Sequence, residues 1–470
     1  MTNKAPLDVQ TVIDERFSPY QRLLLALCFL VVAVDGFDTA AVGYIAPALV
    51  QEWGVPRAAL GPVLSAALFG LAIGALTAGP LADRHGRRIV LLGSVLFFGA
   101  GSLASAFAAT LEQLTALRFL TGLGLGAAMP NAVTLMSEFA PARYRAALVN
   151  AMFCGFPLGS SAGGLLASWL IPHYGWRSVL LLGGVAPLLL AALLWRHLPE
   201  SVRHLAARGA PAAEIRRVLE RIAGRDLSAA AGFVAAEPVV GARSAVGVIL
   251  ARDYRLGSLM LWLAYFMGLL IFYLLTSWLP ILIKDAGFTI SQAALMTALF
   301  PLGGGIGTLA AGYLMDRFNP NRVVALGYAL TAALIFAVGQ GTATMLSLGG
   351  LIFLAGTAMN GAQSSMPALA AGFYPTHGRA TGVAWMLGIG RFGGIAGALL
   401  GGELLRRQLE LELIFALLAI PAALAAAALL CKQRFAAALK PFDAVPAPAS
   451  PPSPANPQEK SHVDTSSSRG

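Results

Sequence analysis

Two aspartates stand in the middle of a long apolar stretch near the start of the chain. Asp35 and Asp38 are the only charged residues between positions 23 and 51. A helix over this run, at about 1.5 Å per residue, exceeds the ~30 Å hydrocarbon layer of a membrane and carries both aspartates near its middle, on one face. A carboxylate at that depth costs roughly 2.5–3.5 kcal/mol, so both must face a protein interior or a wet cavity. The pair indicates a site that exchanges protons or holds a cation, or else a structural ion pair with an arginine of a neighbouring helix.

A lone arginine marks a second apolar stretch far along the chain. Arg391 lies near the middle of the run 380–405, among glycines. A guanidinium buried at that depth requires an anion, and its planar fork matches a carboxylate. Arg391 is therefore expected to clamp the carboxylate of a substrate, or else to form a permanent salt bridge. Few carboxylates lie in this half of the chain, and Glu403 is about three helical turns away.

The composition places these residues in a membrane protein. Of the 470 residues, 57% are hydrophobic and only 12% are charged, against about 25% charged residues in an average soluble protein. Twelve apolar runs are long enough to span a bilayer, at residues 23–51, 60–82, 89–110, 114–137, 146–171, 178–195, 256–283, 293–315, 323–340, 345–373, 380–405 and 411–430. The predicted fold is an all-α membrane protein with twelve transmembrane helices in two six-helix bundles.

The distribution of positive charge predicts the orientation of these helices. Most Lys and Arg residues lie in the connections on the side of the two termini and the central loop, so that side is predicted to be cytoplasmic. The net charge of +10 is thereby explained without a nucleic acid partner. The cysteines and histidines show no metal-ligand spacing, and no strand precedes a nucleotide-binding loop. We therefore expect neither a metal nor an enzyme.

The runs divide the chain into five segments. They are a cytoplasmic N-terminal segment (1–22), a six-helix bundle (23–196), a cytoplasmic central loop (197–254), a second six-helix bundle (255–431) and a cytoplasmic tail (432–470). In the central loop Ile215, Val218, Leu219 and Ile222 recur at helical spacing among arginines, which predicts a short amphipathic helix on the inner membrane surface. The tail is rich in Pro and Ser and is predicted to be disordered.

Two motifs recur between the bundles. Gly79, Leu81, Asp83 and Arg84 after the second run reappear after the eighth as Gly312, Leu314, Asp316 and Arg317. Before the fifth and eleventh runs, Pro141 and Arg145 match Pro375 and Arg379. Two unrelated motifs at nearly one offset indicate a duplicated six-helix unit whose halves enclose a central cavity.

The stretch GPLADRHGRR, residues 79–88, resembles the signature loop of the major facilitator superfamily. The six-plus-six plan also matches that superfamily over almost the whole chain, although the copy after the eighth run is degraded. Such a turn can join two helices by charge-assisted bonds in one state and release them in another, or it can serve topology alone. The residues expected to form this gate are Asp83, Arg84, Arg87, Glu138, Arg145, Asp316 and Arg317.

Four segments resemble one branch of the superfamily, the aromatic acid:proton symporters. They are DGFD at 35–38, RFLTGLGLGAAMPNAVTLMSEFAPARYRA at 118–146, FYLLTSWLP at 272–280 and YPTHGRATGVAWMLGIGRFGGIAGALLGG at 374–402. The resemblance implies a monomer in a bacterial inner membrane that imports hydroxybenzoates, protocatechuate or gallate with protons, and that needs no cofactor beyond the proton gradient. The alternative is a transporter of the same fold for another organic anion, a sugar or a drug. No sensory domain is attached, which argues against a receptor.

In such a fold the first and fourth helices adjoin, so Arg118 is expected to reach Asp38. The pair would keep Asp38 ionised and leave Asp35 less well paired. We expect Asp35 or Asp38 to carry the proton and Arg118 to control its release. Side chains that can stack on a ring or bond its hydroxyls, unless they only pack, are Tyr44, Phe272, Tyr273, Trp278, Trp385, Asn131, Asn360, Gln363 and Ser364.

Overall fold

The structure is a computed structural model, and it describes most of the chain between residues 7 and 436. Outside the described part lie residues 1–6, 229, 231, 235–248, 341–343, 375 and 437–470, and the side chains of Asp83, Ala146, Ala207, 376–380, 435 and 436. The disorder expected for the tail therefore falls almost entirely outside the described residues, as does the side chain of the signature aspartate, Asp83.

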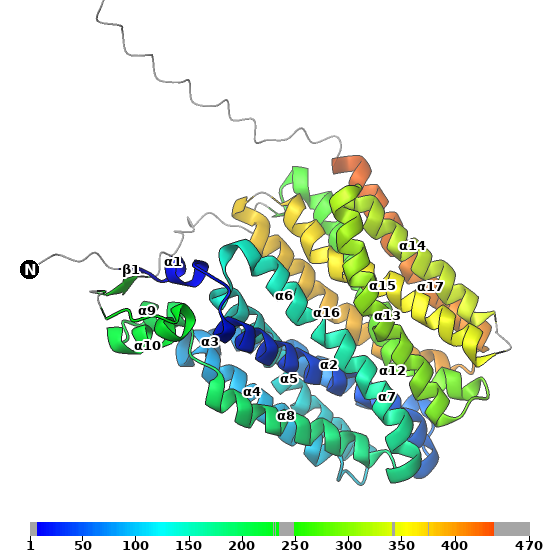
Figure 1. Cartoon of the computed structure of the whole chain (residues 1–470). Helices are drawn as coiled ribbons and strands as arrows, with labels where there is room; N and C mark the ends of the chain where they lie inside the picture. The colour runs from blue at the N-terminus through cyan, green and yellow to red at the C-terminus, as the bar shows by residue number, and fades with distance from the viewer. Residues whose placement is uncertain are drawn as a thin grey trace, which may run out of the picture.

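Twelve helices of the described chain are long and apolar enough to cross a membrane. The first half holds α2 (Pro19–Trp53), α3 (Gly61–His85), α4 (Arg87–Ser105), α5 (Leu111–Phe139), α6 and α7 (Arg145–Phe153 and Gly155–Tyr174, one span) and α8 (Arg177–His197). The second half holds α12 (Arg252–Asp285), α13 (Ile290–Arg317), α14 (Pro320–Gly339), α15 (Met345–Phe373), α16 (Thr376–Arg406) and α17 (Leu411–Ala436). The predicted all-α fold of two six-helix bundles is confirmed, and the bundles lie side by side (Figure 1).

The helices begin and end where local hydrogen bonding allows it. Ser18 caps α2 and Thr289 caps α13, each in a capping box with a glutamine three residues later. Such boxes satisfy backbone N–H groups that have no partner in the first helical turn. Gly54 ends α2 with φ 63°, a left-handed conformation that glycine adopts at little cost.

The internal repeat is visible in how the helices pack. In the first half α3 and α5 touch closely, because a Cβ at Gly122 would collide with the carbonyl oxygen of Ala67. In the second half α13 and α15 repeat this contact, with Gly356 against the carbonyl oxygen of Phe300. Small residues let membrane helices approach at backbone distance. The duplicated sequence unit thus forms a duplicated packing unit.

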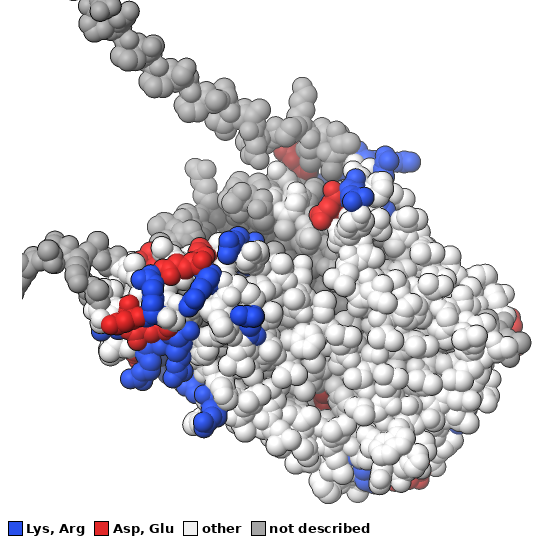
Figure 2. Space-filling model, viewed as in Figure 1, with Lys and Arg blue, Asp and Glu red and all other residues white. Residues whose placement is uncertain are grey.

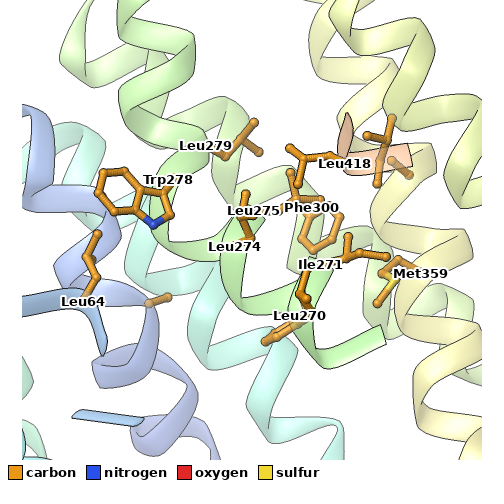
Figure 3. Packing of buried hydrophobic residues seen from close by; sticks show 14 of the residues in the cluster. Leu64, Leu270, Ile271, Leu274, Leu275, Trp278, Leu279, Phe300, Met359 and Leu418 are labelled. Carbon is orange, nitrogen blue, oxygen red and sulfur yellow. The ribbon is translucent and has the colours of Figure 1, made fainter. Parts of the chain in front are cut away.

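The two halves meet near the end that lies away from both chain termini (Figure 1). There α2 packs on α12, α7 on α13, and α16 on both α3 and the short 3-10 helix η1 (Arg57–Leu60). Ser291 of α13 donates its hydroxyl to the carbonyl of Ser168 in α7 at 2.6 Å. One buried apolar cluster crosses this contact and includes Leu64 of α3 and Trp278 of α12 (Figure 3).

The opposite end of the first half carries a small cap built from both the N-terminal segment and the central loop. Its elements are α1 (Val9–Asp14), α9 (Val202–Ala207), α10 (Ala212–Ala223) and the two-residue parallel strands β1 (Leu7–Asp8) and β2 (Phe233–Val234). The amphipathic helix predicted in the central loop is present as α10, and its place on the inner membrane surface stays a prediction. Ile215, Leu219 and Ile222 are buried in one cluster with Val12 and Ile13 of α1, because the N-terminal segment supplies a matching apolar stripe.

Candidate functional site

A buried ion pair joins α2 to α5. Arg118 donates from Nη1 to Asp38 Oδ1 at 3.1 Å and from Nη2 to Oδ2 at 2.7 Å, and both side chains are fully buried. The bidentate geometry offsets part of the cost of removing two charges from water. The expected contact between Asp38 and Arg118 is therefore present. Arg118 Nε is buried without a partner in the described chain, so the pair is not completely satisfied.

Asp35 is buried without a cation in bonding contact. Its side chain is 2% exposed, and the hydroxyl of Thr39 donates to it at 3.2 Å. Thr39 lies four residues after Asp35, on the same helix face, a relation that sequence inspection missed although the spacing displays it. No salt bridge of Asp35 is present within the described part of the chain. The two aspartates therefore differ: Asp38 is paired and Asp35 is not.

Arg391 of α16 is half-buried. It lies close enough for its positive charge to act on Asp35 of the opposite half and on two tyrosines of α12, Tyr265 and Tyr273. Among the residues that the structure describes, Arg391 makes neither a salt bridge nor a hydrogen bond. The carboxylate of Glu403, the alternative partner, is taken by Arg406 and Arg407. A permanent salt bridge of Arg391 is thus not seen, and the guanidinium remains available for an anion.

A small pocket lies beside Arg118 and is lined by residues of α2, α3, α5 and α12. Neither Asp35 nor Arg391 lines it directly. Its polar lining consists of Thr39, Arg118, Tyr273 and Ser277, and leucines such as Leu68 form much of the rest. Thr39 lines the pocket and also donates a hydrogen bond to Asp35. Tyr273 lines the pocket and lies within reach of the charge of Arg391.

Two aromatic residues expected to hold a substrate ring are already used in packing. Tyr44 is fully buried and donates its hydroxyl to the carbonyl of Ser160 in α7 at 3.0 Å. Trp278 is also buried, and its Nε1 donates to the carbonyl of Ala398 in α16 at 2.7 Å. Neither lines the pocket. In this structure these side chains join helices, because their polar atoms bond to backbone groups that the sequence does not display, and their contact with a substrate ring stays a prediction.

Two further aromatic candidates also pack in this structure. Phe272 is buried against Phe156 of the first half and Phe300 of α13. Trp385 is 41% exposed and stacks on Trp262 with ring centroids 5.6 Å apart. Neither residue lines the pocket described above, whereas Tyr273 does.

The polar candidates differ in how their groups are used. Asn131 and Asn360 donate to carbonyls one turn back in their own helices, at 2.8 and 2.9 Å. Ser364 donates to Thr308. Gln363 accepts from the Tyr328 hydroxyl, and its amide nitrogen is buried without a partner in the described chain. None of the four lines the pocket, so their contact with a ring hydroxyl stays a prediction.

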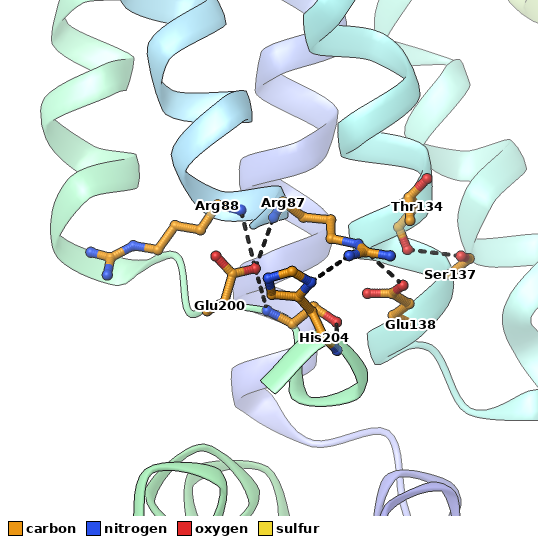
Figure 4. Close-up of polar contacts among 8 residues, drawn as sticks. Arg87, Arg88, Thr134, Ser137, Glu138, Glu200 and His204 are labelled. Atoms are coloured by element: carbon orange, nitrogen blue, oxygen red, sulfur yellow. Dashed lines mark hydrogen bonds and ion pairs between the residues drawn. The ribbon is translucent and has the colours of Figure 1, made fainter. Parts of the chain in front are cut away.

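The signature turn is held by a polar network, shown in Figure 4. Arg87 Nε lies 3.6 Å from Glu138 Oε1 at the end of α5, and Arg87 Nη1 lies 2.6 Å from His204 Nδ1. Glu200 accepts from the backbone N–H groups of Arg87 at 2.9 Å and of Arg88 at 3.3 Å. Arg87 and Glu138 therefore meet as expected. Glu200 and His204 were missed, because contacts between a loop and a turn more than a hundred residues away leave no local pattern.

Other gate candidates do not join this network. Arg145 donates to Gln10 of α1 at 3.4 Å and forms no salt bridge with Glu138. Arg84, Asp316 and Arg317 are exposed, and Arg317 lies 4.4 Å from the ring centroid of Tyr313.

The second signature turn, whose sequence is the degraded copy, differs in structure from the first. In that turn Asn319 uses its side chain to cap α14. The central loop, which supplies Glu200 and His204, packs on the first half. In the part of the chain that the structure describes, the second turn has no comparable ion-pair network.

Two repeated six-helix units with charges buried between them define a secondary membrane transporter. The chain belongs to the Major Facilitator Superfamily, whose family model matches residues 28–291 and 261–465. It is therefore a multi-pass membrane protein of a transporter family and not an enzyme.

Similar proteins with known names place the chain within that superfamily. The 4-hydroxybenzoate transporter PcaK of Pseudomonas aeruginosa is 54% identical over 91% of this chain and 96% of the relative. A gallate transporter of Pseudomonas putida is 51% identical over 94% of this chain and 98% of the relative. Among solved structures, the inward-open xylose transporter XylE from E. coli aligns with a TM-score of 0.68 at 18% identity, over 88% of this chain and 96% of that one. This last likeness concerns the fold alone.

Proposed function

We propose that the protein imports an aromatic carboxylate of the hydroxybenzoate, protocatechuate or gallate type together with protons, by alternating access. The observation that carries the proposal is the meeting of two incompletely paired charges from opposite halves. Asp35 lies on α2 and Arg391 on α16, and each is without a salt bridge in the described chain. A buried charge without a partner is costly and is typical of a transport site.

The substrate class is supported by chemistry and by the relatives. Arginine's planar fork binds a carboxylate through two parallel hydrogen bonds, and the pocket beside Tyr273 has a largely apolar wall that suits a ring. The relatives named for 4-hydroxybenzoate and for gallate each take a molecule with one ring, one carboxylate and at least one hydroxyl. We therefore assign the carboxylate to Arg391 and the ring to the neighbouring pocket.

Charge balance suggests how substrate and proton move together. A substrate carboxylate offsets the charge of Arg391, and a proton offsets the charge of Asp35. The loaded site then carries little net charge apart from the fixed pair of Asp38 and Arg118, which lowers the cost of enclosing it away from water. Loading only one of the two leaves an uncompensated charge, so the occluded state favours both together.

The packing of the halves supports alternating access. The halves touch near the end away from the chain termini, and the signature network lies at the other end, within the first half (Figure 1). The bias of positive charge supports a cytoplasmic position for the terminal side, and we propose that the protein acts in a bacterial inner membrane as a monomer driven by the proton gradient alone. In that orientation the contact between the halves lies on the outer side, which supports an inward-facing state.

The test is uptake by proteoliposomes under an imposed proton gradient. Labelled 4-hydroxybenzoate, gallate, a hydroxycinnamate, a sugar and a dicarboxylate are compared with and without a protonophore. We expect accumulation of the hydroxybenzoates, and its loss with the protonophore. Uptake of a sugar or a dicarboxylate alone would refute the substrate class, and accumulation that survives the protonophore would refute proton coupling.

A further inference from the structure

We propose that the cap side of the first half binds the headgroup of an anionic phospholipid. The site, here called the arginine site, consists of Arg88, Arg196 and Arg221. These residues come from the start of α4, the end of α8 and the amphipathic helix α10. The transport mechanism described above uses none of them.

Helix ends converge at the arginine site. Tyr20, in the first turn of α2, donates its hydroxyl to the carbonyl of His197 at the end of α8, at 3.3 Å. Arg88 donates from Nη2 to the carbonyl of Trp195 at 2.6 Å. Arg221, in the last turn of α10, lies close enough for its charge to act on the Tyr20 hydroxyl, as does the charge of Arg88. Arg196 is exposed in the last turn of α8, between Trp195 and His197. The three arginines thus come from ends of α4, α8 and α10, and α2 contacts both α8 and α10.

The positive charge at this place is not neutralised within the protein. None of the three arginines forms a salt bridge with an acidic residue of the described chain. The nearby carboxylate of Glu200 accepts from backbone N–H groups of the signature turn, and Figure 4 shows the Arg88 side chain directed away from it. Neighbouring cations repel each other, so an anion held among them would be stabilised.

The surroundings favour a lipid over a soluble anion. Trp195 is 68% exposed near the end of α8, and the Arg88 guanidinium lies 5.9 Å from its ring centroid. Exposed tryptophan at the end of a membrane helix is typical of the headgroup level. On α8 the exposed Leu189 and Leu193 lie on the same face as Arg196, at helical spacing. An acyl chain along this apolar stripe would place its phosphate at the arginines.

Charge on the visible surface agrees with this position. Figure 2 shows Lys and Arg, together with some Asp and Glu, gathered at the cap end of the first half, beside a broad face almost without charge. Anionic lipids attract basic residues next to membrane helices. Because Arg221 belongs to α10, a bound headgroup would fasten the cap to the transmembrane helices.

The experiment uses the purified full chain in uncharged detergent, titrated with dioleoyl phosphatidylglycerol or dioleoyl phosphatidylcholine. Bound lipid is counted by native mass spectrometry, and thermal unfolding is followed in parallel. The variant Arg88→Gln/Arg196→Gln/Arg221→Gln is compared with Arg255→Gln/Arg322→Gln/Arg434→Gln. The control removes three arginines that are exposed in the second half, so the net charge of the two variants is equal.

We expect the wild type and the control to prefer phosphatidylglycerol, and the first variant to bind it at least about tenfold more weakly, since each basic residue near anionic lipid contributes measurably. An equal loss of phosphatidylglycerol binding in both variants, or no loss in the first variant, would show that the arginine site does not bind the lipid. Stabilisation of the wild type by inorganic phosphate as strong as that by the lipid would assign the site to a free anion instead. If the triple variant unfolds, Arg196→Gln, an exposed side chain, gives the same comparison at one position.

Discussion

Asp38 and Arg118 show how a membrane protein keeps a charge in its interior. Each side chain is fully buried, and two hydrogen bonds join the guanidinium to the carboxylate. Asp35, three residues earlier on the same helix, has only the hydroxyl of Thr39. Of the two aspartates, we propose Asp35 as the proton carrier, because no cation of the described chain forms a salt bridge with it.

Asp38→Asn is expected to destabilise the protein. The change leaves the Arg118 guanidinium buried without an anion, which typically costs about 3–5 kcal/mol. The thermal unfolding temperature in detergent should fall, and adding Arg118→Gln should restore part of it. Arg406→Gln, at an exposed pair, serves as control and should change it little. A wild-type unfolding temperature in Asp38→Asn would show that the pair is not the stabilising contact.

Asp35→Asn is expected to uncouple substrate transport from the proton gradient. The neutral amide mimics a permanently protonated Asp35, so labelled 4-hydroxybenzoate should still exchange between the two sides without accumulating under a proton gradient. The comparison measures counterflow and gradient-driven uptake in the same proteoliposomes. Thr39→Val removes only the hydroxyl bond and should keep accumulation. Wild-type accumulation by Asp35→Asn would remove this residue from the coupling mechanism.

Arg391→Ala is expected to raise the apparent KM for 4-hydroxybenzoate by roughly 30-fold or more, since truncating one partner of a buried charged pair costs about 2–5 kcal/mol. Arg391→Lys keeps the charge but loses the fork, so its KM should lie between those of the alanine variant and the wild type. Arg407→Ala, an exposed arginine paired with Glu403, is the control. An unchanged KM in Arg391→Ala would exclude Arg391 from carboxylate binding.

At the scale of helices, small residues set the distance between partners. The contact of α3 with α5 and that of α13 with α15 depend on glycines opposite backbone carbonyls. The structure shows the backbones of these helices in close contact at Gly122 and Gly356.

Gly122→Ala and Gly356→Ala are each expected to lower the unfolding temperature. An added Cβ would collide with the carbonyl of Ala67 or of Phe300, and overpacking typically costs about 1–3 kcal/mol. Gly350→Ala is the matched control, because a Cβ there meets no atom of a neighbouring element within 4 Å. Equal unfolding temperatures in all three variants would show that the helices make room for the added methyl group at no cost in stability.

At the scale of the whole molecule, the halves touch near one end and the cap binds one half at the other. A change of access must break the contact between α7 and α13 while each half stays intact. The hydrogen bond from Ser291 to the Ser168 carbonyl marks this contact. The first half carries the additional network of Arg87, Glu138, Glu200 and His204, so the cap moves with that half.

A disulfide across this contact is expected to stop transport. Ser168→Cys/Ser291→Cys, made in a background without Cys28, Cys154 and Cys431, should lose uptake on oxidation and regain it on reduction. The single variant Ser291→Cys should respond to neither treatment. Full uptake by the oxidised double variant, with the disulfide shown by mass spectrometry, would mean that this contact does not open during transport.

The sequence by itself determined the membrane class, the twelve helices, the repeat and the identity of the buried charges. Apolar run length and charge placement are local properties, and a bilayer imposes a helix on every such run. The pairing of Asp38 with Arg118 was also within reach, because both depth and helix order restrict the partners.

Only the tertiary structure decided which polar groups are already satisfied. Tyr44 and Trp278 donate to carbonyls of other helices, and α10 buries its apolar face on α1. Glu200 and His204 join the signature turn across more than a hundred residues. The physical reason is that every residue has a backbone carbonyl and many segments have an apolar stripe, so the sequence does not indicate which of them will meet. Their partners are the groups that the folded chain brings close in space.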